Sequence, residues 1–158
     1  MQKSICSAFY LILFFFILDI VSKLLVNHFL GKSDCIYIFG FLNIVHVENS
    51  GIAFGLFGKS FFLKRIALSS VNIIVFIIVI LMLLRRKKAP STAIVGLSLL
   101  GAGALGNLKD RLFFGYVTDF IDFHVGMYHY PAFNIADACI TVGIFTLIVH
   151  RIILKRTI

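Results

Sequence analysis

The stretch "SAFYLILFFFILDIVSKLLV", residues 7–26, contains only two charged side chains in twenty residues. An apolar segment of about 20 residues is long enough to cross the hydrocarbon core of a bilayer as a helix. Three more runs of similar length follow, at 66–84, 89–108 and 133–153, and the first of these carries no charge. The sequence therefore predicts a protein with four transmembrane helices.

The composition of the chain supports this interpretation. It is 60% hydrophobic and 14% charged, with a mean hydropathy of +1.03, which excludes an ordinary soluble domain. The two longer connections, 27–65 and 109–132, are too short to bury a core of their own, since domains below about 40 residues rarely fold unaided. We expect one integral-membrane domain, 1–158, of the all-α membrane class, with a small extracytoplasmic β or loop element resting on the membrane surface.

The net charge of +8 is distributed unevenly along the chain. Eight basic residues and no acid occupy the two termini and the turn at 85–88. This is the positive-inside pattern, so we expect both termini and this turn in the cytoplasm. A nucleic-acid partner is not expected, because no aromatic stacking platform accompanies the basic residues. The first span has no small-residue cleavage site, which predicts a retained helix rather than a signal peptide.

The first connection contains a short alternating segment. Val45 and Val47 alternate with polar residues, a period of two that predicts a strand, and the run Asn49–Gly51 is typical of a turn. Glycines then flank Phe54 and Phe57, which suggests a mobile cover over residues 49–58.

The acidic residues are scarce and clustered. The chain has seven, of which three lie within Gly106–His124 and a fourth is Asp137. The predicted topology puts Asp119, in a returning loop, at the same membrane face as Asp137, which lies one turn inside a fourth helix that Pro131 would begin. Two carboxyls in contact cannot both ionise easily, so they could form an acid–base pair that activates water. The alternative is two isolated polar contacts.

Other polar residues leave their roles open. Asp19 and Lys23 are four apart on one helix face and can pair, either as a neutral anchor or as part of a site. Asp110 and Arg111 could form an ion pair at the interface. The residues Asp122, His124 and His129 would allow a metal site, but they lack a recognised ligand spacing, so no metal or other cofactor is expected. The three cysteines suggest no disulfide framework.

Five stretches together carry a family resemblance. They are "DIVSK" (19–23), "NSGIAFG" (49–55), "GALGNLKDR" (103–111), "GYVTDFIDF" (115–123) and "PAFNIADACI" (131–140). In this order, on a four-span chain, they resemble the lipoprotein signal peptidases, or signal peptidase II. The resemblance covers nearly the whole chain. Ala102 and Tyr130 depart from it, at positions where the family often has Gly and Trp.

The resemblance implies an aspartyl protease of the bacterial inner membrane. It would cleave prolipoproteins just before a diacylglyceryl-modified cysteine, at the periplasmic face, as a monomer in contact with membrane lipid. Asp119 and Asp137 would be the catalytic pair, whereas Asp122 would not be catalytic. The residues implied around the pair are Asn49, Gly51, Asn107, Arg111 and Asn134, with Asp19 and Lys23 in support.

We expect one aspartate to draw a proton from water and the other, protonated, to polarise the scissile carbonyl. Two alternatives predict different behaviour. A small transporter or channel would use Asp19, Lys23 and Asp137 as a polar pathway through the membrane. A purely structural subunit would tolerate asparagine at both Asp119 and Asp137.

Overall fold

Four long helices make up most of the protein. A computed structural model describes residues 2–32, 34–51, 61–85 and 91–153. These residues contain four helices long and apolar enough to cross a membrane, which confirms the predicted four-span architecture. The helices are α1 (Gln2–Phe29), α2 (Phe61–Arg85), α3 (Ser91–Phe113) and α4 (Ile135–Ile148), and α4 continues into a π-helical turn, η1 (Val149–Ile153).

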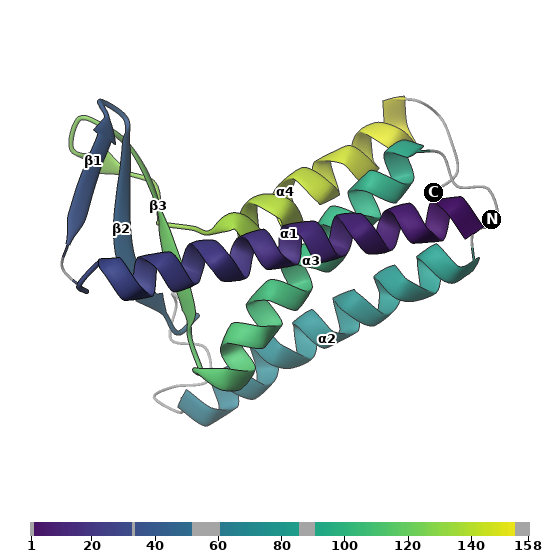
Figure 1. Ribbon diagram of the computed structural model, residues 1–158, viewed down its shortest axis with the longest axis horizontal. Coiled ribbons are helices and arrows are strands. Elements are labelled where there is room, and N and C mark those ends of the chain that lie inside the picture. The colour runs from purple at the N-terminus through teal and green to yellow at the C-terminus, as the bar shows by residue number, and fades with distance from the viewer. Residues whose placement is uncertain (1, 33, 52–60, 86–90, 154–158) are drawn as a thin grey trace.

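Helix α3 is the centre of the bundle and packs against the other three (Figure 1). Within the apolar segment of α3, 72% of the residues are buried, against 17–22% in the other spans. Its small residues explain this position, because they let helix backbones approach closely where lipid provides no hydrophobic drive for association. At Gly103 an added Cβ would lie 2.3 Å from the backbone oxygen of Ala136 in α4. The backbones of α3 and α4 are therefore in direct contact beside the polar end of the bundle.

We expect Gly103→Ala to destabilise the protein by about 1–3 kcal/mol, the usual cost of overpacking, because backbone cannot move aside locally. Gly101→Ala is the matched control, since the nearest atoms that its Cβ would meet belong to side chains, those of Val79, at 3.0 Å, and Ile12, at 3.6 Å. Thermal unfolding of both variants in detergent measures the difference. Equal losses would mean that the α3–α4 backbone contact does not limit packing.

A four-stranded antiparallel sheet lies at the end of the bundle opposite the start of α1 (Figure 1). Strand β2 confirms the strand predicted from the alternation at Val45 and Val47. In the pairing of β2 with β3, Val47 is opposite Asp119. The strands, in their order across the sheet, are β1 (Cys35–Phe39), β2 (Leu42–Asn49), β3 (Val117–Val125) and β4 (Tyr128–His129).

Three local expectations differ from the structure. Asp119 lies in strand β3, not in a loop, because the run Val117–Phe123 pairs along β2. Helix α4 begins at Ile135 rather than at Pro131, since Phe133 is still held in a bridge to Ile121. Helix α3 continues to Phe113, so residues 109–113, expected in a connection, are helical.

The turn expected at Asn49–Gly51 is present. Gly51 has a φ of +68°, and its amide donates to the Asn49 side-chain oxygen at 2.8 Å. The cover expected at 49–58 lies outside the described residues from position 52 onward.

Candidate active site

The first turn of α4 fixes the position of Asp137. Asn134 is the N-cap residue, and its side-chain oxygen accepts from the Asp137 amide at 2.9 Å. Asp137 in turn accepts from the Asn134 amide at 3.4 Å, which completes a capping box. The next free amide, that of Ala136, donates to Asp19 of α1 at 2.9 Å. Three amides at the start of α4, those of Asn134, Ala136 and Asp137, are thus bound by side chains.

Asp119 reaches the same cluster from β3. Its carboxyl is only 1% exposed and accepts two amide hydrogen bonds, from Asn134 at 2.6 Å and from Asn49 at 2.7 Å. Asn134 therefore contacts both Asp119 and Asp137. A strand carboxyl and a helix carboxyl that are 18 positions apart in the sequence lie on either side of one asparagine.

Asn107 links the cluster to α3. Its side-chain nitrogen donates to Asp137 at 2.8 Å, and its oxygen faces Lys23 at 3.4 Å and Asn134 at 3.5 Å. A side-chain amide can donate and accept at once. Asn107 therefore donates to the Asp137 carboxyl while its oxygen accepts from the ammonium of Lys23.

Lys23 is the buried cation beneath this layer. It pairs with Asp19 at 2.7 Å, as the spacing on α1 predicts, and with Asp110 at 2.8 Å. The expected ion pair of Asp110 with Arg111 is wrong, because the carboxylate of Asp110 turns toward Lys23 and Lys109. Asp110 belongs to the cluster, although sequence reasoning gave it only an interfacial role. The sequence does contain a signal for this role: Asp110 follows Asn107 by three residues, which puts both side chains on one face of α3.

Arg111 and Gly51 border the open side of the cluster. The charge of Arg111 acts on Asp137 and Asp119, and its Nη1 donates to the Asn107 carbonyl at 3.5 Å. A Cβ on Gly51 would lie 3.8 Å from the Arg111 guanidinium and 2.4 Å from Leu68. Glycine therefore suits position 51 both for its positive φ and for the close approach of Leu68.

Burial raises the pKa of the Asp119 carboxyl to about 6, from an ordinary value of 3.8. Hydrogen bonds from Asn49 and Asn134 lower it, and the charge of Asp137 raises it further. Asp119 therefore binds a proton more readily than an exposed aspartate does, as expected where two carboxyls share a buried site.

This raised pKa gives a signed prediction for stability. Because protonated Asp119 is favoured in the folded chain, its contribution is fully present below about pH 4 and is lost as pH rises through about 6. Between pH 4.5 and pH 7.5 we expect the stability of the wild type to fall by about 2 kcal/mol relative to that of Asp119→Asn, which has no carboxyl to titrate, from 1.36 kcal/mol per pKa unit. Thermal unfolding of both proteins at the two pH values measures it. A stability difference that does not change with pH would contradict the raised pKa.

A hollow of about 300 Å³ opens beside Asp137. It is lined by Tyr130 and Phe133 before α4 and by Ala138, Thr141 and Val142 along it. A substrate reaching Asp137 from the side of α4 would therefore meet apolar walls.

Comparison with known proteins identifies the family. The family model described as "Signal peptidase (SPase) II" matches residues 11–153. The chain belongs to this family. As a signal peptidase II it is 43% identical, over 137 residues, to the lipoprotein signal peptidase of Coxiella burnetii (strain RSA 493 / Nine Mile phase I), covering 87% of this chain and 84% of the relative. It is 40% identical over 136 residues to that of Buchnera aphidicola subsp. Acyrthosiphon pisum (strain APS), covering 86% and 85%.

A solved structure supports the fold. A bacterial membrane enzyme determined by the in meso method at 2.3 Å resolution superposes with a TM-score of 0.81 and 32% sequence identity, covering 94% of this chain and 88% of that one. The resemblance inferred from the sequence is thus confirmed, and this signal peptidase II is a hydrolase of the multi-pass inner-membrane type. Nothing in these comparisons favours a transporter or channel.

Proposed function

We propose that this signal peptidase II is an aspartyl endopeptidase that removes the signal peptide of diacylglyceryl-modified prolipoproteins, cleaving just before the lipidated cysteine. Asp119 and Asp137 are the proposed catalytic pair. The observation that carries the proposal is the approach of the two carboxyls through Asn134, whose side-chain amide donates to the Asp119 carboxyl at 2.6 Å and whose backbone amide donates to the Asp137 carboxyl at 3.4 Å. The names of the relatives supply the substrate class.

The proposed chemistry needs one carboxyl in each protonation state. Asp137, in the first turn of α4, takes a proton from water as the water oxygen attacks the scissile carbonyl carbon. Asp119, which binds a proton more readily than an exposed aspartate because burial raises its pKa, donates a hydrogen bond from its protonated form to the carbonyl oxygen. When the tetrahedral intermediate collapses, the C–N bond breaks and the proton on Asp137 passes to the departing amine of the cysteine.

The remaining polar residues are proposed to position this pair. Asn49, Asn107 and Asn134 hold the carboxyls by neutral hydrogen bonds, which fix geometry without removing the proton. Arg111 is proposed to hold the edge of the site or a polar group of the substrate, against the backbone at Gly51. Lys23 and Asp19 support the pair through Asn107 and the start of α4.

The site is proposed to lie at the periplasmic face. The sheet is at the end of the bundle away from the start of α1 (Figure 1), and Asp119 belongs to its strand β3 while Asp137 lies in the first turn of α4. In the sequence, eight basic residues belong to the termini and the 85–88 turn. Under the positive-inside rule that charged end is cytoplasmic. One chain supplies all the proposed site residues, which supports a monomer, and the apolar faces of its spans are expected to contact membrane lipid.

The direct test is incubation of the purified protein in detergent with a prolipoprotein, either diacylglyceryl-modified or unmodified. We expect mass spectrometry to show a product that begins at the modified cysteine, and no processing of the unmodified form. Cleavage at another bond, or equal processing of both forms, would refute the proposal.

A further inference from the structure

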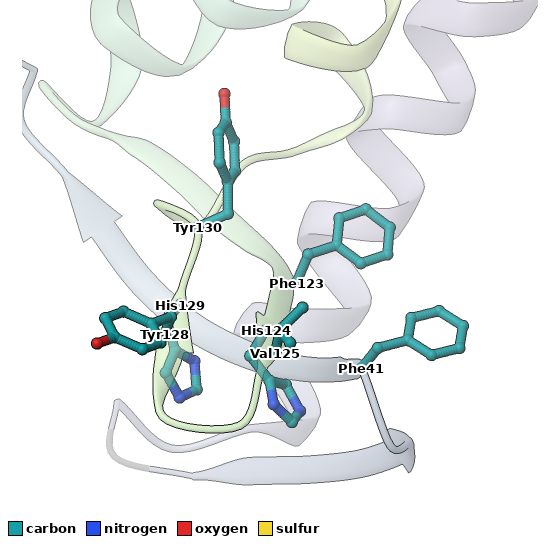
Figure 2. A pocket seen from close by; sticks show the side chains of 7 residues that line it. All are labelled: Phe41, Phe123, His124, Val125, Tyr128, His129 and Tyr130. Carbon is teal, nitrogen blue, oxygen red and sulfur yellow. The ribbon is translucent and has the colours of Figure 1, made fainter.

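An aromatic hollow of about 460 Å³ lies on the sheet, outside the four spans (Figure 2). We name it the hairpin hollow, because most of its lining residues belong to β3 and β4, the two strands of a hairpin. The rings of Phe41 and Phe123 lie side by side along it, 6.4 Å apart, and Tyr128 and Tyr130 complete the aromatic lining. The proposed chemistry does not use any of these side chains.

The hairpin hollow is connected to the catalytic end of the chain. Tyr130 lines both this hollow and the hollow beside Asp137. A row of rings joins the two, with centroids 6.1 Å apart between Tyr130 and Phe133 and 5.7 Å apart between Phe133 and Phe123. Two such steps span at most about 12 Å, which an extended polypeptide covers with about three or four residues.

The chemistry of the hairpin hollow favours an apolar occupant. Its lining residues are aromatic, aliphatic or imidazole side chains. His129 contacts both oxygens of Asp122 at 2.9 Å, and Asn43 donates to the same carboxylate, so this charge is already paired. His124 stacks on the His129 ring with centroids 5.0 Å apart. A flat or bulky apolar side chain fits such a surface better than a charged one.

We propose that the hairpin hollow binds the substrate polypeptide on the far side of the scissile bond, taking an aromatic or large apolar side chain about three to five residues beyond the lipidated cysteine. This inference rests on the proposed function. The signal helix and the acyl chains belong to the bilayer beside the spans, so the segment that leaves the membrane is the one that must pass the sheet. The hairpin hollow is then a specificity determinant that is separate from the catalytic pair.

The test uses two lipidated prolipoproteins that differ only at positions three to five after the cysteine, with Phe and Leu in one and Gly and Ser in the other. We expect the wild type to have a KM about tenfold lower for the aromatic flank, the size of effect that one apolar contact gives. The double variant Val125→Ser/Tyr128→Ser should remove this preference and leave kcat unchanged. Both side chains are more than three-quarters exposed, at 80% and 87%, so the fold does not depend on them.

Met127→Ser is the matched control, because Met127 is 93% exposed in the same hairpin but does not line the hollow. It should keep the preference. Wild-type processing of both flanks with one KM would overturn the inference while leaving the proposed function intact. The double variant could instead raise KM equally for both flanks, in lipid nanodiscs but not in detergent. That result would overturn the inference and assign the hollow to contact with the membrane surface. Failure of the wild type to process either substrate would overturn both proposals.

Discussion

Asp119→Asn and Asp137→Asn are each expected to lower kcat by about 10²–10⁴-fold, the usual contribution of a general acid or base. Asparagine has the shape of aspartate but can neither accept a proton from water nor donate one to the amine. In Asp137→Asn, Asn107 can still donate to the side-chain oxygen, as it does at 2.8 Å in the wild type. The loss should therefore appear in turnover rather than in folding.

Single-turnover processing of the lipidated prolipoprotein measures this effect, with thermal unfolding recorded for each variant. Asp34→Asn is the matched control, since Asp34 is exposed and contacts only the turn at Gly31 among the hydrogen bonds described. It should process substrate at the wild-type rate. A variant that unfolds in the same cooperative transition as the wild type but turns over slowly has lost chemistry rather than its fold. Undiminished turnover in either variant of the pair would refute the proposed chemistry.

The sequence predicted the features that depend on composition and spacing. Four spans follow from run length, and the Asp19–Lys23 pair follows from a four-residue interval within one helix. The approach of Asp119 to Asp137 followed from topology alone, because both had to lie at the same face. These three predictions needed only the local residue pattern and the side of the membrane on which each span ends.

The features that the sequence predicted incorrectly depend on contacts between segments that are distant in the chain. Strand β3 is buried on both faces over residues 117–120, so its polar residues did not suggest a strand until its pairing with β2 was known. The start of α4 is delayed past Pro131 because the Phe133 amide donates to Ile121 in β3. The Lys23–Asp110 pair joins α1 to α3, and no pattern within either helix specifies it.

The same contacts show that the buried polar residues at this end of the bundle depend on one another for charge and hydrogen-bond partners. Asp19 caps the first turn of α4 and also pairs with Lys23, which reaches Asp110 and Asn107 on α3. One buried cation thus connects three helices. A buried ion pair contributes little net stability when complete, but it leaves an uncompensated charge when one partner is removed.

Lys23→Met is accordingly expected to cost about 3–5 kcal/mol of stability, because Asp19 would remain buried without its cation, and Asp110, about 2% exposed, would keep only Lys109. Methionine is one atom shorter than lysine but fills most of its space, so the cost reports mainly lost charge rather than a cavity. Unfolding in mixed detergent micelles measures it, with Lys32→Met as the matched control. Lys32 also pairs with a carboxylate, at 2.9 Å, but its side chain is 70% exposed, and exposed pairs contribute little.

The triple variant Asp19→Asn/Lys23→Met/Asp110→Asn separates charge from geometry. It removes both stranded carboxylates, so we expect it to recover part of the stability that Lys23→Met loses, while the neutral side-chain amide at position 19 can still accept from the Ala136 amide. Recovery of processing should be smaller than recovery of stability, because Asn107 would still lack the cation that it faces at 3.4 Å. If Lys23→Met were no less stable than Lys32→Met, the buried cation would not hold the three helices together, and the position of Asp137 would depend on the capping box alone.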